Sequence, residues 1–360
     1  MTSITEVARR AGVSIATVSR VVSDADYAVS PATRDRVLEA ARELDYVPNA
    51  LARGLLKSRV PVVGVIVHDI TDPYFAEVVR GVEDAAAEAG HLVISCSSER
   101  DPARELEYVR LLRSMRAAVV VFAGSGIDDP AMAHQLPRDA RAIQGYGGTI
   151  VHLSPHALGE PEVSVDNAAG IAALIAAIVA LGHRRIAFLA GPQALFVARD
   201  RLAGYRRGLA EAGLPADERL VVGTTFDRDG GAAGVDELLG RGSPFSAIAC
   251  ANDLLALGAL TRLAELGIRV PDEVSVAGVD DIATAALTSP SLSTVRLPLR
   301  ELGRRGFAFA ERRLAGETPP PERLPTTVVL RASTGPAPAR PLHRATALPP
   351  VPIGGPAPWP

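Results

Sequence analysis

The sequence predicts a mixed α/β protein, with an all-helical unit at the N-terminus and a core of two α/β lobes built on parallel sheets. Three observations predict this: helix caps follow one another closely at the N-terminus, apolar runs alternate with amphipathic stretches from residue 62 onward, and the chain has 360 residues. Alternating helices and continuously apolar strands are typical of parallel sheets covered on both faces. Because a core of roughly 270 residues is too large for one such sheet, we expect two lobes.

Three short helices fit the first 46 residues, and each begins at a recognisable cap. The capping pairs, in chain order, are Ser3 with Glu6, Ser14 with Thr17, and Ser30 with Pro31. Serine side chains accept hydrogen bonds from amides of the first helical turn, and proline fits the first helical position. Gly12, in the turn between the first two helices, can adopt a positive φ without strain. The spacing therefore predicts two helices that cross at a tight turn, followed by a third.

Eight apolar runs predict the buried strands of the core. They cover residues 62–67, 92–96, 118–123, 150–153, 186–190, 221–225, 247–251 and 274–279. Amphipathic stretches between several of them predict helices at residues 77–89, 168–181, 202–212 and 254–266. Residues 335–360 contain nine prolines without periodicity, so we expect a disordered tail there.

Charge is unevenly distributed along the chain. Residues 1–59 carry a net charge of +2 and the remainder −5, which is the asymmetry expected when only the head binds phosphate. Cys96 and Cys250 lie inside apolar runs, as small buried side chains do in a reducing compartment. No basic-then-apolar leader and no apolar run of membrane length is present. We therefore expect a cytoplasmic, nucleoid-associated protein with no membrane partner.

Residues 4–22 carry the pattern of a helix-turn-helix. Valines at 7, 13, 18 and 21 fit a small shared core, and Ala8 allows the two helices to approach closely. Other side chains of the second helix then face outward, where a recognition helix contacts base edges in the major groove. The candidate DNA-binding residues here are Ser14, Ile15, Ala16, Thr17, Ser19 and Arg20.

This segment, together with residues 46–53, closely resembles the LacI/GalR family of bacterial transcriptional regulators. The resemblance covers roughly residues 2–334, with motifs in family order. Those motifs are Asp72-Pro73-Tyr74-Phe75, Val165-Asp166-Asn167, residues 182–186, Gly191-Pro192, residues 201–205, Ala251-Asn252-Asp253, residues 278–281 and residues 294–296. The resemblance implies a helix-turn-helix head-piece before a two-lobed, periplasmic-binding-protein-like core.

The resemblance also implies an order of domains. It places a DNA-binding domain at 1–47, a hinge helix and linker at 48–59, a two-lobed effector-binding and dimerisation core at 60–334, and the Pro-rich tail at 335–360. In the hinge, Leu55 matches the leucine that family members wedge into the minor groove, with Asn49 and Ala52 as further DNA contacts. Ile15 and Ala16 stand where several relatives carry polar side chains, so we expect direct base readout to depend on Arg20 together with a methyl contact from Ile15.

Candidate effector residues follow the predicted strands. Except for Arg201, which begins a helix, they end an apolar run or come just after one: Asp72, Tyr74, Phe75, Ser125, Asp166, Phe226, Asn252 and Asp280. In α/β proteins such positions hold ligands, and in family members the matching positions line the cleft between the lobes. Aromatic faces suit a pyranose and carboxylates or arginine suit its hydroxyls, so we expect a small sugar. Residues 195–197 are apolar where a purine-sensing relative would be polar.

We therefore expect a homodimeric repressor of a carbohydrate-utilisation operon that binds pseudo-palindromic operator DNA and needs no cofactor. A sugar-binding receptor is an alternative, but it would carry a secretion signal in place of the head. An α/β enzyme is another, disfavoured because Pro155 separates His152 from His156 and Gly124-Ser125-Gly126 is no nucleophile elbow. Activation instead of repression, and a co-repressor instead of an inducer, stay open.

Overall fold

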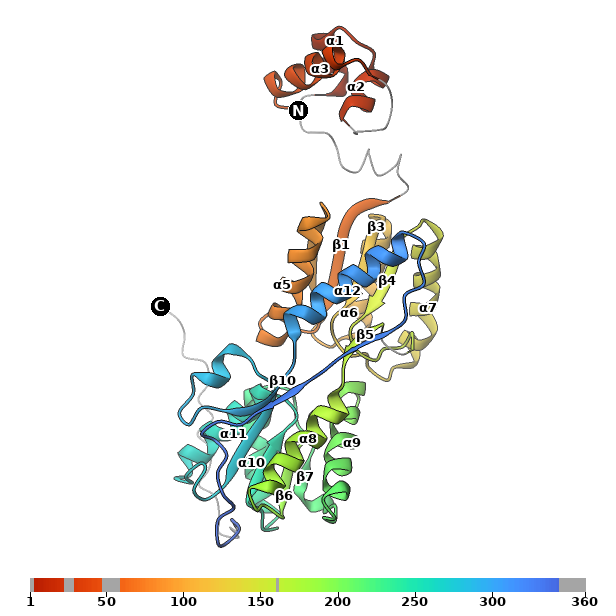
Figure 1. Ribbon diagram of the computed structural model, residues 1–360. Helices are drawn as coiled ribbons and strands as arrows, with labels where there is room; N and C mark the ends of the chain where they lie inside the picture. The colour runs from red at the N-terminus through yellow and green to blue at the C-terminus, as the bar shows by residue number, and fades with distance from the viewer. Residues whose placement is uncertain (1–2, 23–28, 47–58, 160–161, 343–360) are drawn as a thin grey trace, which may run out of the picture.

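The computed structural model describes residues 3–22, 29–46, 59–159 and 162–342, and it shows a small helical unit and two α/β lobes (Figure 1). The helical unit comprises α1 (Ile4–Ala11), α2 (Ile15–Val22) and α3 (Pro31–Glu43). Each begins at its predicted cap. The carboxylate of Glu6 accepts the amide of Ser3 at 2.7 Å, and Ser14 Oγ accepts the amide of Thr17 at 3.1 Å. Valines of all three helices form the buried core.

The N-lobe is a four-stranded parallel sheet in the order β2-β1-β3-β4. Its elements are β1 (Val60–Val67), α5 (Pro73–Glu88), β2 (Leu92–Ser97), α6 (Pro102–Ser114), β3 (Ala117–Phe122), α7 (Pro130–Gly145), β4 (Thr149–His152) and α12 (Leu299–Leu314). Helices α5 and α12 cover one face and α6 and α7 cover the other. Successive residues of β1 point to these two faces, because side chains alternate along a strand.

The C-lobe is a six-stranded sheet in the order β12-β10-β9-β8-β6-β7, parallel except for β12. Its elements are α8 (Asn167–Ala180), β6 (Ile186–Leu189), α9 (Phe196–Glu211), β7 (Val221–Val222), α10 (Arg228–Gly240), β8 (Ala247–Cys250), α11 (Asp253–Glu265), β9 (Ser275–Asp280), β10 (Ser293–Arg296) and β12 (Thr327–Val329). Two short 3₁₀ helices lie at Glu218–Leu220 and Ala283–Ala286. Helix α8 packs on α9, and α10 packs on α11.

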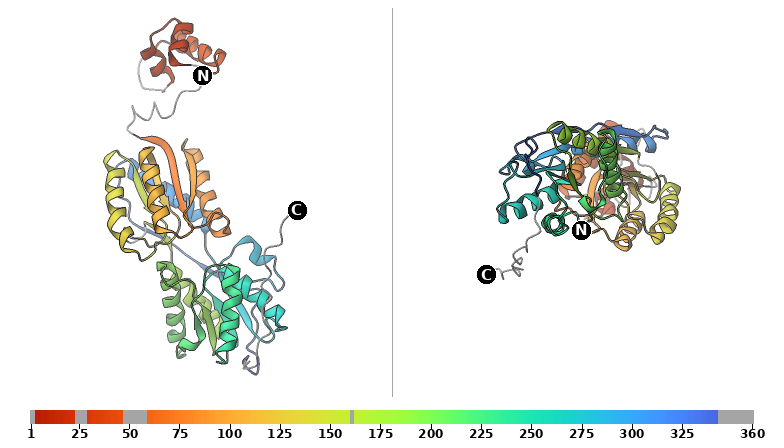
Figure 2. Two further views of the ribbon diagram at one scale, coloured as in Figure 1. Left: turned by 180° about the vertical axis from the view of Figure 1, so that it is seen from behind. Right: turned by 90° about the horizontal axis from the view of Figure 1, so that it is seen from below.

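The chain passes between the lobes three times: after β4, after β10 and after α12 (Figure 2). At the junction, β5 (Val163–Val165) pairs in parallel with β11 (Glu322–Leu324). As a result, α12 belongs to the N-lobe although it follows the strands of the C-lobe. Neither lobe is a continuous stretch of sequence.

Glycines allow helix pairs in both lobes to pack backbone to backbone. In the N-lobe, a Cβ added to Gly81 of α5 would overlap the carbonyl oxygen of Arg300 in α12. In the C-lobe, a Cβ added to Gly258 of α11 would overlap the carbonyl oxygen of Arg228 in α10. A side chain at either position would therefore force the two helices apart.

The predicted fold class is confirmed, and all eight predicted strands are present with small shifts of their ends. Two predictions need correction. The run at 92–96 is not buried, because β2 lies at the edge of its sheet and Leu92 is 63% exposed. The strand predicted at 221–225 is short, ending at Val222. Within the described residues, no helix is both long and apolar enough to cross a membrane.

The prediction of a disordered tail from residue 335 is wrong for residues 335–342, which pack on the C-lobe. The carbonyl oxygen of Gly335 lies 3.0 Å from His183 Nε2. The amide of Ala337 donates to Leu181 at 2.9 Å, and Phe245 and Leu342 exchange two backbone hydrogen bonds at 3.2 and 2.8 Å. Proline removes its own amide donor, but the residues between prolines keep theirs and can pair. The core thus extends past its predicted end at 334, and residues 343–360 lie outside the described residues.

Candidate functional site

The outer surface of α2 is the first candidate site. Val18 and Val21 are buried against α1 and α3, which turns the opposite side of the helix outward. Ile15, Ala16 and Arg20 are exposed there, with Ile15 at 47%. Ser14, also exposed, caps the helix, and Thr17 and Ser19 are partly buried. The other three predicted DNA-binding residues, Asn49, Ala52 and Leu55, lie outside the described residues.

A cavity between the lobes, with about 430 Å³ of empty space including the solvent at its mouth, is the second candidate site. The structure brings eight of the nine predicted effector residues to its wall: Asp72, Tyr74, Phe75, Ser125, Arg201, Phe226, Asn252 and Asp280. They come from both lobes, at the carboxyl ends of strands and the starts of helices, except for Arg201. The prediction that Arg201 begins a helix is wrong, because α9 begins at Phe196 and Arg201 lies in its second turn.

Asp166 is the exception. Its carboxylate caps α8 by accepting the amide of Ala169 at 2.9 Å, and it lies 3.6 Å from Arg323. It lines a neighbouring pocket that shares Ser154 with the cavity. The structure therefore does not place Asp166 with the other eight.

Arg201 is buried, and its guanidinium is fully engaged by the protein. Its Nε donates to Asn167 Oδ1 at 2.9 Å, and its two terminal nitrogens donate to the carbonyl of Ala251 at 2.5 Å and to Asp280 at 3.1 Å. These bonds join α9 to the start of α8 and to the ends of β8 and β9. Arg201 thus braces the C-lobe wall and orients the carboxylate of Asp280. Burial raises the pKa of Asp280 well above its ordinary value, and the charge of Arg201 opposes that rise.

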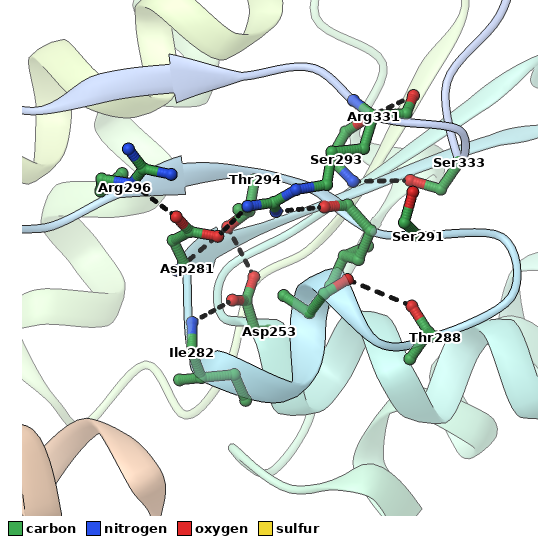
Figure 3. Close-up of polar contacts among 12 residues, drawn as sticks. Asp253, Asp281, Ile282, Thr288, Ser291, Ser293, Thr294, Arg296, Arg331 and Ser333 are labelled. Atoms are coloured by element: carbon green, nitrogen blue, oxygen red, sulfur yellow. Dashed lines mark hydrogen bonds and ion pairs between the residues drawn. The ribbon is translucent and has the colours of Figure 1, made fainter.

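The loop that carries Asp280 is held by a polar network behind the wall (Figure 3). Asp280 and Asp281 both have positive φ, at 119° and 57°. The carboxylate of Asp281 accepts Arg296 at 2.6 Å and Arg331 at 2.7 Å. The buried carboxylate of Asp253 accepts the Thr294 hydroxyl at 2.6 Å and the amide of Ile282 at 3.0 Å. This network offsets the backbone strain and fixes the loop.

Burial also raises the pKa of Asp253, to about 7, although its hydrogen bonds oppose the rise. Gly278 makes room for this carboxylate, since any side chain there would overlap it. The polar groups of the C-lobe wall are thus buried but hydrogen-bonded within the protein.

The N-lobe wall is formed by the segments that follow β1, β2, β3 and β4. Asp72 caps α5 by accepting the amide of Tyr74 at 3.0 Å, and burial raises the pKa of its carboxyl group. The Tyr74 and Phe75 rings pack edge to face at 4.9 Å. Phe75 also belongs to the apolar core, so it both packs the lobe and lines the cavity.

Hydrogen bonds connect the two lobes beside the cavity. Ser125 Oγ accepts the amide of Val197 at 3.0 Å, and the amide of Phe196 donates to Gly126 at 3.3 Å. Ile127 and Leu195 form an isolated antiparallel bridge. The hydroxyl of Ser125 is therefore used to hold the start of α9, a role that its position after a strand did not predict.

Sequence reasoning missed three polar residues of the cavity, His68, Arg100 and Ser154. Each follows a strand: His68 comes directly after β1, Arg100 three residues after β2 and Ser154 two residues after β4. The rule that selected the other residues therefore also applies to these three. Arg100 was missed because the pattern of apolar residues in the sequence does not indicate the turn that carries it.

Behind the N-lobe wall lie two histidine–glutamate pairs. His156 Nε2 lies 2.7 Å from Glu105, and His152 Nδ1 lies 3.0 Å from Glu162. Burial lowers the pKa of His152, whereas its hydrogen bond to Glu162 opposes that shift. Among the described residues, no group of three or more His, Cys, Asp or Glu side chains is placed to hold a metal ion.

Comparison with known proteins gives matches over most of the chain. Residues 3–49 match the family described as bacterial regulatory proteins, lacI family, and residues 175–334 match a periplasmic binding protein-like domain. The HTH-type transcriptional regulator GalR of Salmonella typhimurium is 35% identical over 322 residues, which cover 89% of this chain and 92% of the relative.

Two solved structures extend the likeness to three dimensions. A complex of the transcriptional regulator CelR with cellobiose has a TM-score of 0.67 and 34% identity, covering 92% of this chain and 100% of that chain. The lac repressor dimer bound to operator and the anti-inducer ONPF has a TM-score of 0.78 and 26% identity, covering 93% and 99%. These relatives are named as regulators of transcription, and none of the three is named as an enzyme.

Proposed function

The chain belongs to the lacI family of bacterial regulatory proteins, and from that premise we propose that it represses a carbohydrate-utilisation operon. In this proposal, a homodimer binds pseudo-palindromic operator DNA, and a small sugar or sugar derivative between the lobes controls the affinity. One observation carries it: a single chain combines an outward-facing helix of a helix-turn-helix with a cavity lined by both lobes. The cellobiose held by CelR and the operator held by the lac repressor dimer support the two ligands.

Residues 1–47 bind DNA in this proposal, with α2 in the major groove. Arg20 is exposed on α2 and is the one long donor among the proposed base-contacting residues. Residues 48–59 form the hinge, where Asn49, Ala52 and Leu55 contact the operator. The core begins at residue 60 and includes the segment up to Leu342 that packs on the C-lobe.

The cavity is the proposed effector site because it lies where the two lobes meet. A ligand there contacts both walls, so its binding changes the relative stability of lobe arrangements. Phe226 and Tyr74 offer aromatic surfaces, while Asp72, Asn252 and Asp280 offer acceptors for hydroxyl groups. By linkage, an effector that weakens operator binding must itself bind more weakly to the operator complex.

The DNA half of the proposal is tested with operators selected from random DNA, by fluorescence anisotropy at fixed salt. Arg20→Ala should cost about 1–3 kcal/mol on the selected operator and much less on random DNA. Arg42→Ala is a matched control, since Arg42 is exposed on α3 and pairs with Glu39 at 3.2 Å. Equal losses on both DNAs would make Arg20 a phosphate contact.

The effector half is tested by titrating operator release against a panel of sugars and sugar derivatives, with nucleosides as controls. Release by a sugar or derivative is the expected result. If nothing on the panel other than a nucleoside alters operator affinity, the proposed effector class is wrong.

A further inference from the structure

The N-lobe wall of the cavity carries a guanidinium that has no close ion-pair partner among the described residues, although it interacts electrostatically with the carboxylates of Asp69 and Asp72. Arg100 lines the cavity, and its Nε is buried without a hydrogen-bond partner. Across the described ranges, no carboxylate lies within ion-pair distance of it: its neighbour Glu99 pairs with Arg104 at 2.8 Å, and Asp72 caps α5. Arg201, the other guanidinium of the cavity, is by contrast matched by Asp280.

The turn that carries Arg100 is strained and anchored. Glu99 and Arg100 both adopt the left-handed backbone conformation, with φ of 54° and 60°. The amides of Ser98 and Glu99 donate to the carbonyls of Val67 and His68 at 2.9 and 2.7 Å, at the end of β1. These bonds keep the turn in a conformation that non-glycine residues rarely adopt. The fold therefore holds Arg100 at the cavity.

His68 lies on the same wall and also offers an unused atom. Its side chain is 4% exposed, and its Nε2 is buried without a hydrogen-bond partner. Burial lowers the pKa of His68 to about 3, so the ring is neutral near pH 7. The ring bonds to the backbone of Ser125, which leaves Nε2 as an acceptor. Gly124 leaves room for this atom, since a Cβ there would lie 2.7 Å from Nε2.

We propose that the ligand of this cavity is an anionic sugar derivative, whose carboxylate or phosphate pairs with Arg100 and whose hydroxyl donates to His68 Nε2. The inference rests on the proposed function, because it takes the cavity as the effector site. A guanidinium binds carboxylate and phosphate through paired, charge-assisted hydrogen bonds. A neutral sugar would leave the half-buried guanidinium of Arg100 without an ion-pair partner.

The test compares each neutral sugar with its charged counterpart on the full-length protein. Galactose is paired with galacturonate, and glucose with gluconate and with glucose 6-phosphate, using calorimetry and native mass spectrometry. At least one anionic member should bind ten times more tightly than its neutral partner, as charge-assisted hydrogen bonds require. The carboxylates and the phosphate form separate arms, so the preferred anion identifies the headgroup.

Variants then assign the preference to Arg100. Arg100→Gln should abolish the tenfold preference, and Arg100→Lys should keep part of it because the charge remains. Arg206→Gln is the matched control: Arg206 is about half exposed, pairs with Glu218 at 3.0 Å and does not line the cavity. Its preference should equal that of the parent.

Three results would overturn the inference: no anion on the panel binds, a neutral sugar binds as tightly as its charged partner, or Arg100→Gln keeps the preference. The first two depend on the parent protein alone, so a variant that fails to fold does not hide the answer. Operator release by a neutral sugar would overturn the inference and keep the proposed function. Anion binding through Arg100 without any change in operator affinity would keep the inference and overturn the proposed function.

Discussion

The two lobes share an architecture but differ in how far their buried polar groups are hydrogen-bonded. In the N-lobe, His68 Nε2, His152 Nε2, His156 Nδ1 and Asp139 Oδ2 have no hydrogen-bond partner among the described residues. In the C-lobe, the side chains of His183, Asp253, Asp280 and Asp281 are all hydrogen-bonded. Burial lowers the pKa of His68 and raises that of Asp253, so in each lobe the neutral form is favoured.

Because of this difference, we expect the two walls of the cavity to have different roles in ligand binding. The C-lobe wall is rigid because Arg201, Asp280 and the network behind them satisfy one another. The N-lobe wall leaves Arg100 and His68 with unused hydrogen-bonding atoms. Selectivity for a ligand is therefore expected to depend more on the N-lobe, and preorganisation on the C-lobe.

The largest expected effect concerns the close packing of helix pairs at glycine, which both lobes share. Gly81→Ala and Gly258→Ala should each destabilise the protein by about 2–3 kcal/mol, because the new methyl group overlaps a backbone carbonyl of the facing helix. Urea unfolding measures the change. Gly240→Ala, which has open space around it, is the control and should be neutral or slightly stabilising. If only one of the two glycines is sensitive, the lobes do not share this packing.

The second effect is a pH dependence of protein stability that arises in the N-lobe. The pKa of His68 is about 3 in the folded protein and 6.5 when exposed, so its contribution to stability is complete above pH 6.5 and decreases as the pH falls toward 3. Between pH 7 and pH 5 the loss should be about 2 kcal/mol. His68→Gln should remove this loss, measured as a shallower acid dependence of urea unfolding.

His134→Gln is the matched control for the pH experiment, because His134 is exposed on α7. Its acid dependence should equal that of the parent. A His68→Gln profile that superimposes on the parent profile would show that His68 is not the group whose burial makes the N-lobe acid-sensitive.

The smallest effect concerns the C-lobe alone. Ending the chain after Thr334 removes the backbone hydrogen bonds of Ala337 and Leu342 and the contact of Gly335 with His183. We expect a loss on the order of 1 kcal/mol, because some of the freed groups regain water as a partner. A chain that ends after Leu342 keeps these contacts and is the reference. Equal melting temperatures for the two truncations would mean that the segment 335–342 adds no stability.

Local chemistry explains why most of the site was predictable. The caps at Ser3 and Ser14 involve residues three positions apart, and strand ends can be located from apolar runs, so Asp72, Asn252 and Asp280 could be placed at one edge. The strained turn at Arg100 depends on hydrogen bonds to the neighbouring strand β1, which a local pattern does not contain.

Pairings between distant segments account for the rest. Helix α12 packs on α5 at Gly81. Strand β2 lies at the edge of its sheet because it pairs only with β1. An apolar run such as 92–96 has the same composition at an edge as at the centre of a sheet. For the same reason, the pairing of Leu342 with Phe245 could not be found in a Pro-rich composition.

The return of α12 to the N-lobe also has a consequence for protein synthesis. When β4 leaves the ribosome, the face of α5 around Gly81 has no partner, because α12, which packs on it, is not yet translated. Roughly 160 further residues separate His152 from the end of α12, which is on the order of 10–30 s at ~5–20 residues per second. Most of the C-lobe, from β6 to β10, is translated within that interval, so it can begin to fold before the N-lobe is complete; its edge strand β12 and residues 331–342 follow α12. The lobe translated first thus waits for a helix that is translated after most of the other lobe, and the helix face that α12 will cover is available to chaperones until Leu314 emerges.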